Sequence, residues 1–295
     1  MNWSAIHYEC TLHGEGITRL EATGEREEAR CFDAANRRVT MAWFEHGGSR
    51  IYYEEVGSGA PALLLPGFSQ SSEHLATLRD ALAADYRIIA VDLPGSGRSQ
   101  PQPRTYTASY FEDDATACAA LLRERGTTPA HLIGFSDGGE VALLMAALTP
   151  DLARSVVTWG AAGRLNDPEG QLRAVMQSLI DQPIPPLQKY RDFLVAYYGE
   201  DNARTMTRNQ TQGISDIIDG EKHGELALAM ADRITCPALL ITGEHDMFVP
   251  PPLVRQFAER IPHAETLIVE GANHDVQNSH PDWLARTLLE WLARH

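Results

Sequence analysis

The chain has 295 residues, of which 43% are hydrophobic and 22% are charged, a balance that excludes an intrinsically disordered protein. Forty acidic and 25 basic side chains give a net charge of −15, which repels phosphate groups, so we expect neither nucleic acid nor an anionic membrane surface as a partner. No apolar run reaches the roughly 18 residues of a membrane span, and the first residues do not resemble a secretory signal, so we expect a cytoplasmic protein.

From Val39 onward, short β-branched or apolar runs alternate with longer helix-like segments. This alternation predicts an α/β protein with a mostly parallel eight-stranded sheet and helices on both faces. Residues 1–38 are weakly periodic and form an N-terminal extension of unknown structure: an appendage, an extra hairpin or a start-site artefact. The eight strands are expected at Val39–Phe44, Arg50–Val56, Ala62–Leu65, Arg87–Val91, Ala130–Gly134, Ser155–Gly160, Ala238–Gly243 and Glu265–Val269.

Helix-like periodicity lies between and after these strands. Two of the helices are expected to begin at a proline, Pro251 and Pro281, because the missing N–H costs nothing in the first helical turn. The predicted helices are Ser72–Ala84, Tyr110–Arg125, Gly138–Thr149, Pro251–Arg260 and Pro281–Arg294.

Between residues 163 and 223 the strand–helix alternation stops. The segment contains clustered prolines and an aromatic run, which predicts an inserted, mostly helical cap over one edge of the sheet. The remaining ranges, 39–162 and 224–295, then form the core domain. A second small domain without a catalytic role is the alternative.

The strongest chemical signal is a G-x-S-x-G pattern centred on Ser136, between the strand-like run His131–Ile133 and the helix-like run Val141–Ala147. A strand that turns sharply into a helix strains the central residue and exposes its hydroxyl, which predicts a nucleophile. The alternative is a glycine-rich turn in which Ser136 only caps the helix.

A serine nucleophile needs a base within hydrogen-bonding reach and a carboxylate to orient that base. Asp246 follows the predicted strand 238–243, and His274 follows the strand 265–269. Ser136, Asp246 and His274 therefore occur in the chain order of an α/β-type triad, each beyond the carboxyl end of a strand. Three rival acids, which lie in a strand end or beside the histidine, are less well placed: Glu244, Glu270 and Asp275.

The reaction also requires N–H donors for the negative oxygen of the intermediate. In this geometry one donor is the backbone N–H of Asp137, and the second is expected from the loop after strand 62–65, at Phe68, where Gly67 permits a tight turn. The glycine-rich loop of residues 92–99 matches no phosphate-binding pattern and is predicted to be structural.

The four cysteines, Cys10, Cys31, Cys118 and Cys236, are widely spaced and form no C-x-x-C pair. Zinc-protease and zinc-finger spacings are absent as well. We therefore expect no disulfide framework, no metal and no cofactor.

The motifs LLPGF, DLPGSGRS, GFSDGG, TGEHDMFVP and GANH, in this order and spacing, resemble the α/β-hydrolase fold superfamily from about Val39 to His295. Together with the run ITCPALL, the aspartate after the nucleophile is most similar to the valacyclovir hydrolase (biphenyl hydrolase-like) group. This resemblance implies cleavage of α-amino acid esters, with Asp137 as a substrate-binding residue for the ammonium group.

The residues support a role of this kind for Asp137. A carboxylate beside an oxyanion hole disfavours an anionic transition state unless a cation is bound there too. In the alternative, the Asp137 side chain turns aside and only complements the helix N-terminus.

The sequence thus predicts a cofactor-free serine hydrolase that acts on a small ester, lactone or amide through an acyl-enzyme. The same triad could cleave a C–C bond or catalyse perhydrolysis, and a ligand-binding receptor without turnover is a further alternative. Chemistry with an aspartate nucleophile is disfavoured because Ser136 stands at the centre of the turn. The oligomeric state stays open.

Overall fold

The computed structural model describes residues 28–33 and 35–295. Its centre is one nine-stranded sheet with the strand order β1-β2-β3-β5-β4-β6-β7-β8-β9. The strands are β1 Glu28–Phe32, β2 Arg38–His46, β3 Ser49–Val56, β4 Ala60–Leu65, β5 Tyr86–Val91, β6 Ala130–Phe135, β7 Ala153–Trp159, β8 Ala238–Gly243 and β9 Ala264–Val269.

The eight predicted strands are all present, so the predicted class is confirmed, but the strand count of eight is wrong. The ninth strand, β1, pairs antiparallel with β2, with Arg30 opposite Thr40. It lies in the segment 1–38, for which the sequence left the structure open; residues 1–27 and 34 of that segment lie outside the described residues. Ala29 and Cys31 are buried, and the residues between and beside them are half-buried. This alternation covers only five residues within a charged stretch, so the sequence pattern does not predict the strand.

The strand directions bring the loops of the predicted motifs to one edge. β4 pairs parallel with β5 and β6, and β6, β7, β8 and β9 continue the parallel order. β3 runs antiparallel to both β2 and β5. The segments that follow β4, β6, β8 and β9 therefore leave the sheet at the same edge, which is where open parallel sheets place their sites.

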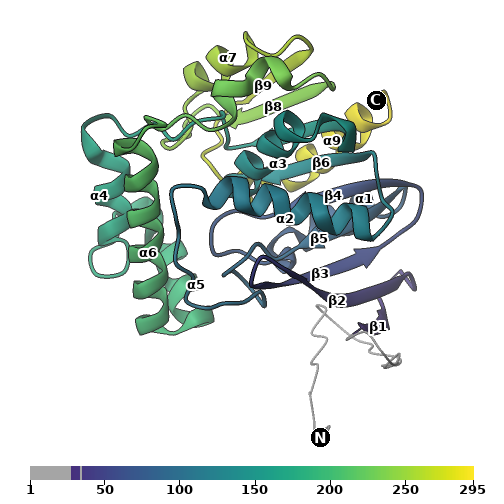
Figure 1. Ribbon diagram of the computed structural model, residues 1–295, viewed down its shortest axis with the longest axis horizontal. Helices are drawn as coiled ribbons and strands as arrows, with labels where there is room; N and C mark the ends of the chain where they lie inside the picture. The colour runs from purple at the N-terminus through teal and green to yellow at the C-terminus, as the bar shows by residue number, and fades with distance from the viewer. Residues whose placement is uncertain (1–27, 34) are drawn as a thin grey trace, which may run out of the picture.

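Helices cover both faces of the sheet (Figure 1). Successive residues of β4 alternate between two cores: Leu63 and Leu65 pack in one with α2 and α3, whereas Ala62 and Leu64 pack in the other with α1 and α9. Burial on both faces explains why the central strands are continuously apolar. The helices of the core are α1 Ala76–Leu82, α2 Tyr110–Glu124, α3 Asp137–Leu148, α7 Pro251–Ala258, α8 Val276–Ser279 and α9 Pro281–Leu292.

The inserted cap consists of three helices, α4 Gln171–Ser178, α5 Gln188–Tyr198 and α6 Glu200–Asp219. They stand together at one side of the sheet, on the left of Figure 1, and α6 packs against both α4 and α5. Among the described helices, none is long and apolar enough to cross a membrane.

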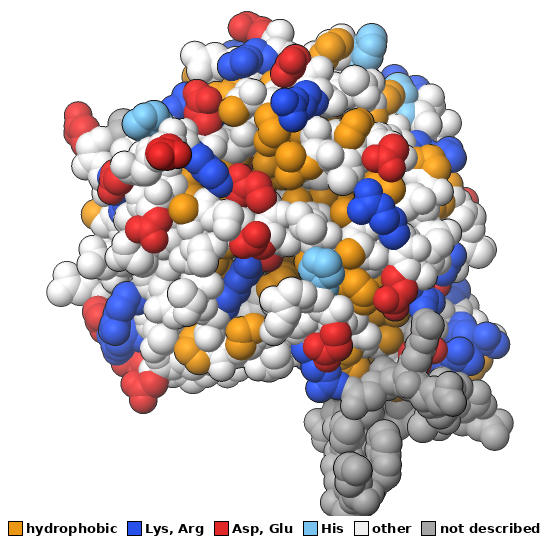
Figure 2. Space-filling view, in the orientation of Figure 1, with side chains coloured by type: hydrophobic (Ala, Val, Ile, Leu, Met, Phe, Trp, Pro, Cys, Tyr) orange, Lys and Arg blue, Asp and Glu red, His pale blue; other side chains and the backbone are white. Residues whose placement is uncertain are grey.

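Charged side chains of both signs are interspersed over the face of the molecule in Figure 2. The net negative charge is therefore not gathered into a single patch on that face. That face therefore has no single-sign field with which to steer a charged macromolecule.

A buried ion network holds two loops at the carboxyl edge of the sheet. Arg79, which is 2% exposed, pairs with Glu54 of β3, and Arg98 reaches Glu54 at 3.2 Å. Arg98 also donates to Asp92, whose other oxygen accepts the Ser72 N–H at 2.6 Å. Asp92 thereby connects the loop after β5 to the segment after β4.

Loss of a buried cation from this network should cost far more than loss of an exposed one. We expect Arg79→Met to lower the free energy of unfolding by about 3 kcal/mol, because Glu54 loses a buried partner. The matched change Arg87→Met removes a cation that is 31% exposed and pairs with Glu55, and it should cost less than about 1 kcal/mol. Urea unfolding of both variants checks this, and equal losses would contradict it.

Candidate active site

Ser136 occupies a strained turn between β6 and α3. Its backbone has φ 52° and ψ −119°, a region that residues other than glycine rarely adopt. The turn can close because the residues two positions before and two positions after Ser136 are glycine. A Cβ at Gly134 would lie 2.2 Å from the carbonyl oxygen of Gly138, and a Cβ at Gly138 would lie 2.4 Å from that of Pro66. The structure therefore places Ser136 in the expected sharp turn between strand and helix, the nucleophile elbow.

Three side chains from separate loops form a chain of hydrogen bonds at this point. Ser136 Oγ lies 3.0 Å from His274 Nε2, and His274 Nδ1 lies 2.8 Å from Asp246 Oδ2. The other carboxylate oxygen of Asp246 accepts the backbone N–H groups of Phe248 and Val249, each at 2.9 Å. Because Asp246 accepts, His274 carries its proton on Nδ1, and Nε2 is left to accept from the serine.

The rival acids have other positions. Glu244 Oε2 accepts the Gly271 N–H at 3.0 Å, Asp275 accepts from Asn278 at 3.1 Å, and Glu270 is exposed. Asp246 is the acid that the structure brings to His274.

The imidazole of His274 is held by close packing. Phe135 and Phe248 both pack against it, each with its ring centroid 5.0 Å from that of His274. Gly160, at φ +67°, lies so close that a Cβ there would stand 2.6 Å from His274 Cε1. The sequence marks Gly160 only as the end of a strand. Its contact with His274 could not be predicted, because the two residues are far apart in the chain.

Two backbone N–H groups beside Ser136 have no acceptor among the described residues. Asp137 is the first residue of α3, and the first N–H groups of a helix have no partner within it. Gly67 abuts the elbow, since a Cβ there would lie 3.2 Å from Ser136 Cβ. Within the described part of the chain, the N–H of the next residue, Phe68, donates no hydrogen bond.

The side chain of Asp137 faces the cap. Its Oδ2 accepts a hydrogen bond from Gln210 Nε2 of α6 at 2.8 Å, and burial raises the pKa of this carboxyl to about 7. Three nearby polar atoms are buried and have no partner among the described residues, namely Gln210 Oε1 and the hydroxyls of Tyr106 and Tyr110. Burial raises the pKa of both phenols, and the charge of Asp137 contributes in the same direction. Sequence reasoning missed these three residues, since nothing in the local pattern marks them.

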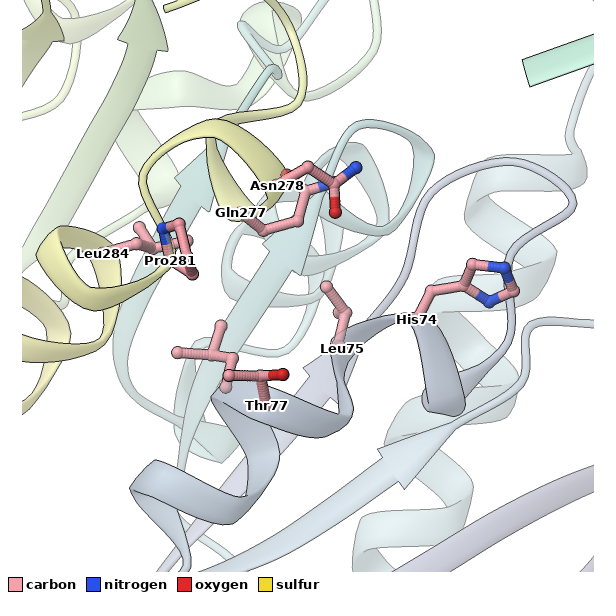
Figure 3. A pocket seen from close by; sticks show the side chains of 8 residues that line it. His74, Leu75, Thr77, Gln277, Asn278, Pro281 and Leu284 are labelled. Carbon is pink, nitrogen blue, oxygen red and sulfur yellow. The ribbon is translucent and has the colours of Figure 1, made fainter. Parts of the chain in front are cut away.

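A small cavity of about 60 Å³ lies beside α1 and α8, with Thr77 on one wall and Gln277 and Pro281 on the other (Figure 3). It has room for a few water molecules and is too small for an ester. Gln277 is held there by the Trp159 indole N–H, which donates to it at 2.7 Å. Within residues 28–33 and 35–295, no group of three or more metal-ligating side chains is close enough to hold an ion.

Comparison with known proteins gives consistent matches. The family model described as "Alpha/beta hydrolase family" matches residues 62–287. The human serine hydrolase BPHL is 32% identical over 225 residues, which cover 72% of this chain and 72% of that protein. A pimeloyl-[acyl-carrier protein] methyl ester esterase from Chromobacterium violaceum is 30% identical over 261 residues and covers 82% of this chain and 98% of its own.

Solved structures show the same fold. A serine hydrolase, CCSP0084, from Cycloclasticus zankles superposes with a TM-score of 0.69 at 20% identity, covering 86% of this chain and 98% of that one. The sheet order, the strained turn at Ser136 and the match over residues 62–287 all agree. The chain belongs to the alpha/beta hydrolase family.

Proposed function

We propose that the chain is a serine hydrolase that cleaves a small carboxylic ester through an acyl-enzyme. The observation that carries the proposal is the pair of hydrogen bonds joining Ser136 to His274 and His274 to Asp246. A serine hydroxyl is a weak nucleophile, and this arrangement supplies both a base and a group that orients the base.

Each residue has one role in the proposed reaction. Ser136 Oγ attacks the ester carbonyl while His274 Nε2 takes its proton, and Asp246 stabilises the resulting imidazolium. The N–H groups of Phe68 and Asp137 donate to the negative oxygen of the tetrahedral intermediate. His274 then gives the proton to the leaving alcohol, and a water molecule, deprotonated by the same histidine, hydrolyses the acyl-enzyme.

The sequence left open three alternatives to an esterase: a ligand-binding receptor, a C–C hydrolase and a perhydrolase. A receptor does not need a serine, a histidine and an aspartate linked by hydrogen bonds, so the geometry favours an enzyme. C–C hydrolysis and perhydrolysis could use the same three side chains. The alcohol ester is the simpler assignment because the triad alone is sufficient for it.

Covalent labelling tests the proposed nucleophile. Incubation with a fluorophosphonate should phosphonylate the protein at one site, Ser136, as measured by intact mass and peptide mapping. Ser136→Ala should abolish both the labelling and the hydrolysis of p-nitrophenyl butyrate, while circular dichroism stays unchanged. Labelling that persists in Ser136→Ala, or no labelling of the parent protein, would contradict the proposal.

We further propose that Asp137 selects substrates that carry a cationic amine. An ammonium has three N–H donors, and this corner of the site offers a carboxylate and the buried, unpartnered Gln210 Oε1. Two phenol oxygens, of Tyr106 and Tyr110, are unpartnered as well. A bound cation would satisfy these acceptors and offset the repulsion between Asp137 and the anionic transition state.

A matched pair of substrates measures this selection. At pH 7.5 the parent protein should prefer valine benzyl ester to its N-acetyl form by about 100-fold in kcat/KM, which corresponds to about 2.7 kcal/mol. Asp137→Asn should remove most of the preference, with little effect on the N-acetyl ester. Equal rates for the two esters in the parent protein would contradict the role of Asp137 and leave a general esterase.

The preference should also fall when the pH is lowered from 7.5 to 5.5. Because kcat/KM reports ionisation in the free enzyme and the free substrate, Asp137, with its pKa raised to about 7, takes up a proton over this range and loses its charge. The α-amine of the valine ester, with an ordinary pKa of about 7.7, titrates in the opposite sense, but its cationic fraction rises by less than about 2-fold. Titrations of other enzyme groups act on both esters alike and cancel in the ratio. A ratio independent of pH in this interval would count against Asp137.

A further inference from the structure

The loop that carries Phe68 makes a tight turn with a strained residue in it. The Gln70 N–H donates to the carbonyl oxygen of Gly67 at 3.1 Å, which closes a four-residue turn. Its third residue, Ser69, is fully buried and has φ 60°. Turns with a positive φ at this position usually have glycine there, so the serine backbone is strained. Rotation of the peptide between Phe68 and Ser69 would relieve this strain.

Two tyrosines of the cap hold this turn. The Tyr190 hydroxyl donates to the carbonyl oxygen of Phe68 at 3.0 Å, and the Tyr198 hydroxyl donates to that of Ser69 at 2.6 Å. Since the only Tyr190 hydroxyl proton goes to Phe68, the Ser69 hydroxyl donates to the Tyr190 oxygen, at 2.9 Å. Tyr198 in turn accepts the Gly97 N–H at 2.7 Å. Both carbonyls of the strained turn are thus fixed by one helix, α5.

The chemistry of the two phenols suits a permanent support. Burial raises the pKa of both Tyr190 and Tyr198, so each hydroxyl keeps its proton and donates throughout the neutral range. Both side chains come from the same helix, and the segment after the turn contacts that helix as well: the ring centroid of His74 lies 4.6 Å from that of Phe193. The cap therefore touches the loop along the length of α5.

We propose that Tyr190 and Tyr198 are positioning residues, which hold the Phe68 turn in its strained form so that the Phe68 N–H stays aligned with the oxyanion. This inference rests on the proposed function, in which Phe68 is an oxyanion donor. It makes the cap a part of transition-state stabilisation as well as a cover for the substrate. Tyr190 is the more direct support, since the carbonyl that it binds belongs to Phe68. This carbonyl is on the peptide group after the donor N–H, so Tyr190 acts by preventing Phe68 from turning about its own backbone.

Hydroxyl removal tests the proposal with little change in packing. Tyr190→Phe and Tyr198→Phe should each lower kcat for p-nitrophenyl butyrate by about 10- to 100-fold, somewhat less than deletion of an oxyanion donor, with KM changed less than about 3-fold. The affinity of a boronic acid, which forms a tetrahedral adduct on the serine, should fall in proportion to kcat/KM. Tyr86→Phe is the matched control because Tyr86 begins β5, at the amino end of the strand and away from the elbow, and it should leave kcat unchanged.

A purely structural role would give a different pattern. It would lower the melting temperature or raise KM while the boronate affinity per folded molecule stayed at the parent value, and that result would overturn the proposal. A kcat within 2-fold of the parent in both variants would overturn it too. If the parent protein neither turns over esters nor binds the boronate, the proposed function itself fails, which is a separate outcome.

A second variant isolates the backbone strain. Glycine accepts a positive φ without cost, so the double variant Tyr190→Phe/Ser69→Gly should recover part of the kcat lost in Tyr190→Phe. The companion double variant with Ser69→Ala keeps the strain and should recover none. Equal kcat in the two double variants would overturn the strain argument.

Discussion

The site depends on one constraint, the backbone strain at Ser136, where a strand turns into a helix within a single residue. The turn holds Ser136 at φ 52°, and it closes only because Gly134 and Gly138 let the backbone segments approach to distances that a Cβ would forbid. The same closeness brings the start of α3 and the loop after β4 together beside Ser136. The proposed nucleophile and the proposed oxyanion donors are therefore positioned by one packing arrangement.

The groups around the strained turn at Ser136 are each held in place by further contacts. Asp246 is fixed by two backbone N–H groups before it reaches His274, and Gly160 leaves just enough room for the imidazole. The segment that carries Phe68 is held by two sets of hydrogen bonds. Asp92 accepts the Ser72 N–H, and the two tyrosines of α5 donate to the carbonyls of the turn. The donors and acceptors of the proposed reaction are thus held by contacts within the protein itself, which is the condition under which electrostatic stabilisation is most effective.

The features that could be predicted from the sequence are those with a local signature. The buried strands are marked by β-branched runs, and Ser136 is marked by the glycines that its strained backbone requires. Asp246 and His274 could then be inferred, because parallel strands bring their carboxyl ends to one edge. The order of motifs carried the assignment of the superfamily, and the family match confirms it.

The features that could not be predicted depend on contacts between distant segments. Tyr190 lies 122 residues from Phe68 along the chain, and Gln210 lies 73 residues from Asp137. Helical periodicity in the cap shows which residues pack but not which hydroxyl or amide meets the core. The edge strand β1 could not be predicted for a different reason. Only two of its residues, Ala29 and Cys31, are buried, and an alternation this short is not recognisable among charged neighbours.

The central claim is that Ser136 is the nucleophile and that the N–H groups of Phe68 and Asp137 form its oxyanion hole. A crystal structure of the protein after reaction with a fluorophosphonate tests this most directly. We predict a phosphorus atom bonded to Ser136 Oγ, with the phosphonyl oxygen about 3 Å from both backbone nitrogens. A phosphonyl oxygen directed away from these two nitrogens, or an adduct on another residue, would contradict the account.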